Sequence, residues 1–321
     1  MKVEINELLR ILRLPTEKLF KELKNCPYAV AGRHYVLWHR GEGLPCLVAH
    51  IDHVYEEERG WDKRPILYNE EYLWSPLGIA GDDRAGVYAV RLLFEELEVN
   101  ALFTDLEEKG GIGAWEACEC RQLANTPYFI EIDRRNEKEA VFYNEEEILV
   151  PEFVEVVSKY FTVAKGSFSD ISILGSHFNV ASVNLSAGFY NEHQRSAEYI
   201  YIPALQYTIE TVPKLISELG DKRYELPEFS FWHYSHYWSW GKGKSSRSRI
   251  KSSKKSSYLW WYEPEEEKEE IKDTCPVECW DCGALDWDRL VGYYCWEIED
   301  APDTEHPRCL KKKLKEVEPW L

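Results

Sequence analysis

Six side chains that could form a metal centre occur in a fixed order along the first two-thirds of the sequence. They are His50, Asp82, Glu107, Glu108, Asp133 and His193. Each follows an apolar, strand-like run or lies in a loop before a predicted helix, and in an α/β sheet such places gather at one edge. Zinc enzymes use imidazole nitrogens and carboxylate oxygens as ligands and leave one position open for water. The set is therefore typical of a two-zinc hydrolase.

The chemistry of such a site explains the mixture of residue types. Two zinc ions need a bridging carboxylate between them and can activate a shared water, while a further, unligated carboxylate must accept the proton of that water. The adjacent Glu107 and Glu108 can divide these tasks because neighbouring side chains point in different directions. Alone, His50 would more simply be a buried structural histidine, and the glutamates a solvated pair. The complete ordered set favours the metal centre.

At these residues the sequence resembles the co-catalytic zinc exopeptidases of the aminopeptidase and carboxypeptidase superfamily (clan MH), over residues 28–218. The resemblance rests on HID at 50–52, DDRAG at 82–86, EEKGGIGA at 107–114, Asp133 after FIEI, and NEHQ at 191–194. It implies two Zn²⁺ ions, for which Co²⁺ or Mn²⁺ could substitute because carboxylate-rich sites admit several metals. It also implies short peptides as substrates.

The same resemblance assigns a role to each residue. His50 and Asp133 would bind the first zinc, Glu108 and His193 the second, and Asp82 would bridge the two. The remaining two carboxylates would have catalytic roles: Glu107 as the general base, and Asp52 as the group that orients the His50 ring. In this family the peptide bond after the bridging aspartate is usually cis, so we expect a cis bond between Asp82 and Asp83.

The spacing of the motifs bears on the type of exopeptidase. The gaps between His50 and Asp82 and between Asp133 and His193 are too short for an inserted domain. That indicates the single-domain architecture, which in this family is mostly aminopeptidase. The DDRAG, EEKGGIGA and NEHQ motifs are closer to two-domain relatives, so a carboxypeptidase or an N-acyl amino-acid deacylase remains an alternative. A third alternative is a catalytically silent binding protein that acts through its C-terminal tail.

Composition is consistent with a cytoplasmic enzyme. The 321 residues include 57 acidic and 39 basic side chains, a net charge of −18, which makes nucleic acid an unfavourable partner for the whole molecule. We expect no membrane segment, because the sequence has neither a long apolar run nor the apolar core of a signal peptide. Nine cysteines without a secretion signal indicate reduced thiols. Assembly into a homo-oligomer is compatible with these features.

Apolar periodicity predicts an α/β fold in which helices sandwich a mostly parallel mixed sheet. Helical spacing covers residues 4–25, with a break at Pro15. The runs YVLWHR and CLVAHI read as strands joined by a hairpin turn through Gly41 and Gly43. The segment GIGAWEACECRQLA is predicted to be a single helix. Further alternating strands and helices extend to residue 219.

The composition changes after residue 222, which predicts three parts: a catalytic domain over 1–222, a linker over 223–272 and a small cysteine-rich module over 273–321. The basic segment 242–255 could contact nucleic acid, although a solvated linker is the simpler interpretation. The module could hold a structural Zn²⁺ ion, and unligated thiols are the equal alternative. Its candidate ligands are Cys275, Cys279, Cys282, Cys295 and Cys309.

Overall fold

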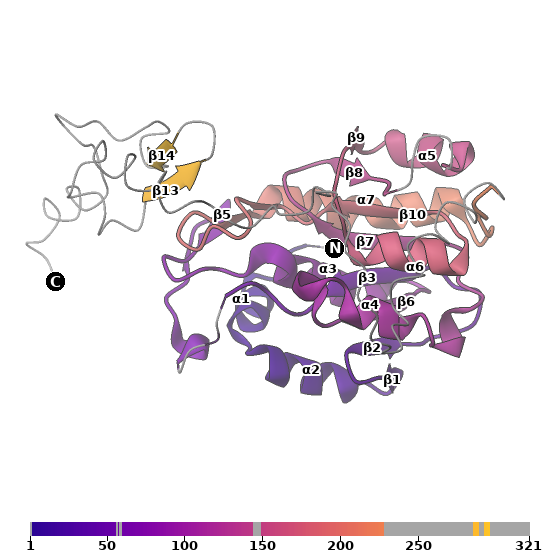
Figure 1. The fold of residues 1–321 in the computed structure, drawn as a ribbon, viewed down its shortest axis with the longest axis horizontal. Helices are drawn as coiled ribbons and strands as arrows, with labels where there is room; N and C mark the ends of the chain where they lie inside the picture. Colours follow the sequence, from indigo (N-terminus) through magenta and orange to yellow (C-terminus); the bar gives the residue numbers. More distant parts are fainter. Residues whose placement is uncertain are drawn as a thin grey trace, which may run out of the picture. The chain divides into compact units, whose positions relative to one another are not determined.

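The computed structural model describes residues 2–55, 57, 60–143, 149–227, 285–288 and 292–295 (Figure 1). The chain divides into two units, Met1–His233 and Tyr234–Leu321. The described part of the second unit is a pair of antiparallel strands, β13 (Leu285–Asp288) and β14 (Gly292–Cys295). The three-part division by composition stays a prediction.

The first unit is built on an eight-stranded sheet with the order β1-β2-β6-β3-β7-β10-β8-β9. The four central strands β6, β3, β7 and β10 are parallel to one another, whereas β2 and β8 flank them antiparallel. The predicted mostly parallel, mixed sheet is thus confirmed. The bounds are β1 (Ala29–Ala31), β2 (Tyr35–Trp38), β3 (Cys46–His50), β6 (Asn100–Thr104), β7 (Phe129–Arg134), β8 (Glu139–Val141), β9 (Thr162–Ala164) and β10 (Ser182–Ser186).

Helices cover both faces of this sheet (Figure 1). One face packs against α1 (Ile5–Arg13), α2 (Thr16–Lys24), α3 (Gly81–Glu96), α5 (Pro151–Ser158) and α7 (Ile202–Leu219). The other face packs against α4 (Ile112–Ala117) and α6 (Asp170–Phe178). Strand β3 shows the cause: Leu47 and Ala49 enter the first core, and Cys46 and Val48 the second, because successive strand residues point to opposite faces.

The predicted break at Pro15 is confirmed, since α1 ends at Arg13 and α2 begins at Thr16. The predicted hairpin between β2 and β3 is wrong, because β6 lies between these two strands. The buried Asn100 at the start of β6 holds the intervening loop: its side chain accepts hydrogen bonds from the Arg40 and Gly41 amides at 2.8 and 3.2 Å. Strand β6, which is distant in sequence, thus pairs with both β2 and β3 in place of the direct β2–β3 pairing that the turn pattern suggested.

The predicted helix over GIGAWEACECRQLA is also wrong in extent. Helix α4 ends at Ala117, and a separate 3₁₀ turn, η3, covers Arg121–Leu123. Between them Cys120 adopts an extended backbone conformation (φ −79°, ψ 109°), which interrupts the helical hydrogen bonding.

A second, four-stranded sheet has the order β11-β12-β5-β4. Its strands are β4 (Leu67–Tyr68), β5 (Tyr72–Trp74), β11 (Phe189–Tyr190) and β12 (Tyr199–Tyr201), and a 3₁₀ turn, η1 (Trp61–Lys63), precedes them. The antiparallel pairing of β5 with β12 ties the long segment that follows β3 to the segment that carries His193. In the part of the chain that the structure describes, no helix combines the length and apolarity needed to cross a membrane.

Candidate metal centre

The candidate ligands meet at the carboxyl ends of the central parallel strands. His50 is the last residue of β3, Asp133 lies near the end of β7, and both glutamates lie in the 3₁₀ turn η2 (Glu107–Lys109) that follows β6. Together with Asp82 and His193 they line a cavity of about 310 Å³. The fold therefore brings together all six side chains singled out from the sequence.

The first group of donors surrounds His50, whose side chain is almost completely buried. Its Nε2 atom lies 3.0 Å from Asp82 Oδ1 and 3.4 Å from Asp133 Oδ1. Asp133 is held in turn by Asn184, which accepts a hydrogen bond from the Asp133 amide at 2.9 Å and donates one to Asp133 Oδ2 at 3.3 Å. One imidazole nitrogen and two carboxylates thus converge on one point.

The second group surrounds His193, which lies in the loop between β11 and β12. Its Nε2 atom is 3.2 Å from Asp82 Oδ2 and 3.0 Å from Glu108 Oε1. Asp82 therefore presents one oxygen to each histidine, which is the arrangement a bridging carboxylate needs. The donor atoms of Asp82, Glu108 and His193 all lie within 4.8 Å of one another.

Asp52 stands behind the ligands rather than among them. Its Oδ1 atom is 3.3 Å from His50 Nδ1, on the side of the ring that faces away from Asp82. Its two carboxylate oxygens also accept the amide hydrogens of Glu107 and Glu108 at 3.1 and 3.2 Å. The predicted orienting residue thus contacts the ring that it would orient, and it also holds the turn that carries both glutamates.

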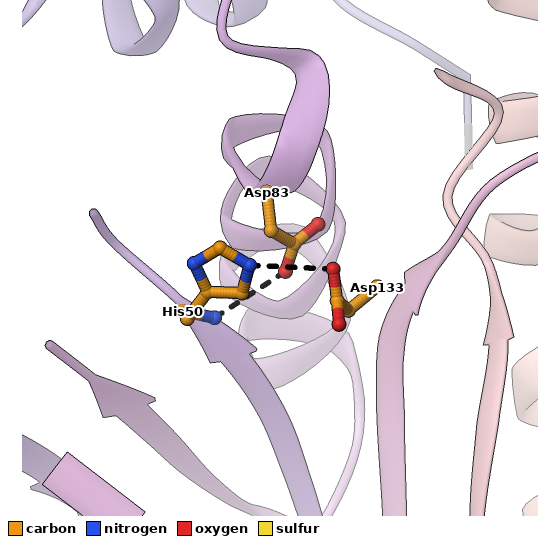
Figure 2. Close-up of side chains that lie close together, drawn as sticks. All are labelled: His50, Asp83 and Asp133. Atoms are coloured by element: carbon orange, nitrogen blue, oxygen red, sulfur yellow. Dashed lines mark hydrogen bonds and ion pairs between the residues drawn. The ribbon is translucent and has the colours of Figure 1, made fainter. Parts of the chain in front are cut away.

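The start of α3 contains a second buried aspartate that sequence reasoning did not single out. The Asp82–Asp83 peptide bond is cis, as expected. Asp83 Oδ2 accepts the His50 amide hydrogen at 3.3 Å, and Asp83 Oδ1 accepts that of Gly86 at 3.0 Å. Figure 2 shows Asp83 and Asp133 beside His50, the former reached by its main-chain nitrogen and the latter by its ring. Asp83 therefore anchors the loop that presents Asp82.

The cavity concentrates negative charge in a buried place. Burial raises the pKa of Glu107 to about 9, with repulsion from Asp133 adding to the effect. Burial also raises the pKa of Asp133 to about 7 and that of Asp83 well above its usual range. Hydrogen bonds to Asp82 and Glu108 raise the pKa of His193 to about 11. A bound divalent cation would favour the charged carboxylates and replace the proton on His193.

The residues present fit a pair of zinc ions. The two arginines that line the cavity, Arg134 and Arg135, are engaged elsewhere, in ion pairs with Glu139 and Glu192. The central carboxylates thus face one another and two histidines rather than a lysine or an arginine. Imidazole nitrogens with carboxylate oxygens in two groups joined by one aspartate are a donor set that zinc accepts.

Sequence reasoning missed a further buried carboxylate, Glu198. It is 1% exposed and accepts hydrogen bonds from the main chain on either side of Gly81. In a chain with 57 acidic residues, no local pattern distinguishes it. Of the cysteines proposed for a structural zinc site, Cys295 is the last residue of β14. The other four, Cys275, Cys279, Cys282 and Cys309, lie outside the described residues, as does the basic segment 242–255.

Comparison with known proteins relates the fold to exopeptidases. No protein-family model and no curated protein matches the sequence. Among solved structures, aminopeptidase PepT from Bacillus cereus is similar over 67% of this chain and 97% of its own, with a TM-score of 0.51 and 13% identity. A tripeptidase from Staphylococcus aureus is similar over the same shares, with a TM-score of 0.50 and 12% identity.

At this level of identity the likeness concerns the fold. The chain has the fold of these two peptidases, so the architecture that the resemblance implies is confirmed. The described domain covers nearly the whole of both similar structures. The chemistry must be argued from the site itself, because one fold can carry many functions.

Proposed function

We propose that the protein is a zinc-dependent exopeptidase that hydrolyses short peptides, and specifically an aminopeptidase. The observation that carries this proposal is the Asp82 carboxylate, whose two oxygens lie 3.0 Å from His50 and 3.2 Å from His193. His50, Asp82 and Asp133 would hold one Zn²⁺ ion, and Asp82, Glu108 and His193 the other. When bound, the two ions would polarise the scissile carbonyl and lower the pKa of a shared water.

Glu107 supplies the proton transfer that the reaction needs. It lines the same cavity as the ligands, but neither group of donors needs it to complete a bridged pair. Burial raises its pKa to about 9 in the absence of a cation; two bound cations would lower that pKa and leave the carboxylate free to accept a proton. Its carboxylate would take a proton from water and deliver it to the leaving amine.

A larger cavity of about 830 Å³, lined in part by Asp52, shares Glu108 with the cavity of the metal centre. Its walls come from α2, from the turn before β2, and from the segment after β3 that includes Val54 and Tyr55. This volume is adequate for a few residues of substrate. We assign to it the part of the peptide that extends away from the ions.

One observation favours a second candidate, a carboxypeptidase or N-acyl amino-acid deacylase. Arg33 and Lys109 are exposed side chains that line the larger cavity, and a cation there could bind a free substrate carboxylate. The carboxylates that line the smaller cavity, among them Asp82, Glu108 and Asp133, would instead suit a free substrate amine and favour the aminopeptidase. The proposed base at Glu107 argues against the third alternative, a silent binding protein.

A peptide panel tests the choice. Zinc-loaded protein is given short peptides of one sequence with a free N-terminus, an acetylated N-terminus or an amidated C-terminus. Cleavage that survives amidation and stops on acetylation is the expected result. Cleavage that survives acetylation and stops on amidation would replace the aminopeptidase by a carboxypeptidase or deacylase. No cleavage of any peptide by protein that binds two ions would overturn the proposed activity.

A further inference from the structure

The buried carboxylate of Glu198 joins three segments around the metal centre. Its Oε1 atom accepts the amide hydrogen of Asp82 at 3.0 Å, and its Oε2 atom accepts that of Ala80 at 3.2 Å. The hydroxyl of Tyr55, in the segment after β3, donates to the same Oε2 atom at 2.6 Å. All three donors therefore converge on one side chain that is 1% exposed.

These hydrogen bonds hold the main chain at the point where it turns to present Asp82. Ala80 adopts a left-handed conformation (φ 57°) that a non-glycine residue rarely takes. The amides of Ala80 and Asp82 lie at the start of α3, where a helix leaves its first N–H groups without internal partners. Glu198 satisfies two of these donors, so it fixes the direction from which the Asp82 carboxylate enters the cavity.

Glu198 belongs to the same loop as His193. The Glu198 amide donates to the carbonyl of Gln194 at 2.8 Å, and the Asn191 side chain donates to the carbonyl of Ala197 at 3.3 Å. The loop is therefore closed by hydrogen bonds of its own, which link Glu198 to the residue after His193 and Asn191 to the residue before Glu198. Because this loop carries His193 near one end and Glu198 at the other, and Glu198 accepts the Asp82 amide hydrogen, the loop relates the position of His193 to that of Asp82.

We propose that Glu198 is a positioning residue that sets the separation of Asp82 and His193 and thereby the affinity for the second metal ion. This inference rests on the proposed function, because it assigns that ion to Asp82, Glu108 and His193. The first ion depends less on Glu198, since Asn184 holds Asp133 and Asp52 lies against His50. Loss of Glu198 should accordingly separate the two binding steps.

A glutamine cannot replace this carboxylate. Its amide oxygen can accept from Asp82 or from Ala80, but its NH₂ group then faces the other main-chain N–H. That leaves a buried donor unsatisfied and pushes the loop apart. Space for adjustment is small, because a Cβ atom at Gly81 would already lie 2.9 Å from Phe189 and 3.2 Å from Glu198.

The test measures metal binding to the full-length apoprotein, with no activity assay. Co²⁺ is titrated while its visible absorption is followed, and Zn²⁺ affinities are measured against a competing chelator. For Glu198→Gln we expect the second step to weaken roughly 10- to 100-fold, the range for residues that support metal ligands, with the first step changed less than about threefold and an altered second Co²⁺ spectrum. Tyr55→Phe removes one of the three donors and should have a smaller effect in the same direction.

Glu116→Gln is the matched control. Glu116 also accepts two main-chain amide hydrogens, from Arg33 and His34 at 2.7 and 2.9 Å, but it contacts none of the proposed ligands. We expect it to bind both ions as the wild type does. Thermal unfolding of the apoproteins shows whether each variant is folded, and the Tyr55→Phe result decides the matter if Glu198→Gln does not fold.

Three outcomes would overturn the inference. The first is an affinity for the second ion within about threefold of wild type in Glu198→Gln, or in Tyr55→Phe if the glutamine variant does not fold. The second is an equal loss of affinity in Glu116→Gln. The third is an equal weakening of both binding steps in Glu198→Gln. Wild-type protein that binds no second ion would overturn the proposed function together with this inference. That result differs from a normal wild type with an unaffected Glu198 variant, which would remove the role of Glu198 alone.

Discussion

Replacement of Asp52 by asparagine should weaken metal binding without changing any proposed ligand. The Asp52 carboxylate accepts the amide hydrogens of Glu107 and Glu108 at 3.1 and 3.2 Å and lies 3.3 Å from His50 Nδ1. Asparagine has a single acceptor oxygen, so its NH₂ group must face one of these partners. The substitution therefore disturbs the ring of His50 and the turn that carries Glu108 at the same time.

The magnitude follows from the two main-chain hydrogen bonds. Asparagine can accept only one of the two amide hydrogens, and the other buried N–H is left without a partner, which costs up to about 3 kcal/mol. If that energy appears in metal binding, the affinity falls roughly 100-fold. The assay is competition for Zn²⁺ with a chelator of known affinity. Asp62→Asn, an exposed aspartate in η1, serves as the control and should bind zinc normally.

The reasoning would be refuted by an Asp52→Asn protein that folds and binds zinc within about threefold of wild type. That result would mean that the His50 ring and the turn carrying Glu107 and Glu108 keep their positions without the Asp52 carboxylate. A loss of similar size in Asp62→Asn would instead attribute the effect to the change in net charge.

Three further variants test the base, the helical layer and the closest packing. Glu107→Gln should lower kcat about 10²- to 10⁴-fold while both ions stay bound, and loss of metal with activity would contradict its role as base. The hydrogen bond from Arg10 lowers the Glu22 pKa from 4.5 to about 2. A lowered pKa contributes stability that is fully present above pH 4.5 and is lost as the pH falls toward 2. Glu22→Gln should therefore remove about 1 kcal/mol of this acid-dependent stability, allowing for solvent screening, when unfolding is measured from pH 6 to 2.5. Gly86→Ala places a methyl group against the Ile132 carbonyl oxygen and should lower the free energy of unfolding by about 3 kcal/mol, whereas a wild-type melting temperature would show that α3 can shift.

Much of the candidate site could be predicted from the sequence because several of the ligands follow recognisable strand-like runs. His50 follows the apolar run CLVA and Asp133 the run FIEI, and parallel strands bring such ends to one edge. The roles assigned to these residues remain predictions, although the distances agree with them. The aminopeptidase specificity, the cytoplasmic location, the homo-oligomer and the tail zinc site also remain predictions.

The features that escaped prediction depend on contacts between distant segments. Asp83 adjoins Asp82 in the sequence, and only the fold shows that its oxygens hold the main chain at His50 and Gly86. Glu198 acts on a helix start far from it in the sequence. The predicted β2–β3 hairpin was wrong for the same reason: the glycines Gly41 and Gly43 allow a turn, but β6 pairs between the two strands that the turn connects. Local sequence patterns indicate where helices and strands form, whereas contacts between distant segments decide which of them lie next to one another.

The hydrogen bond from Tyr55 to Glu198 joins residues 143 positions apart, and the ligands themselves come from segments spread over the same span. No partial chain that ends before the His193 loop can assemble the bridged pair of donors. Binding of the second ion would therefore be restricted to the completed domain, and mass action should make it stabilise that domain by an amount that grows with the logarithm of free ion concentration. The resistance of the first unit to proteolysis should then increase with the concentration of free metal ion.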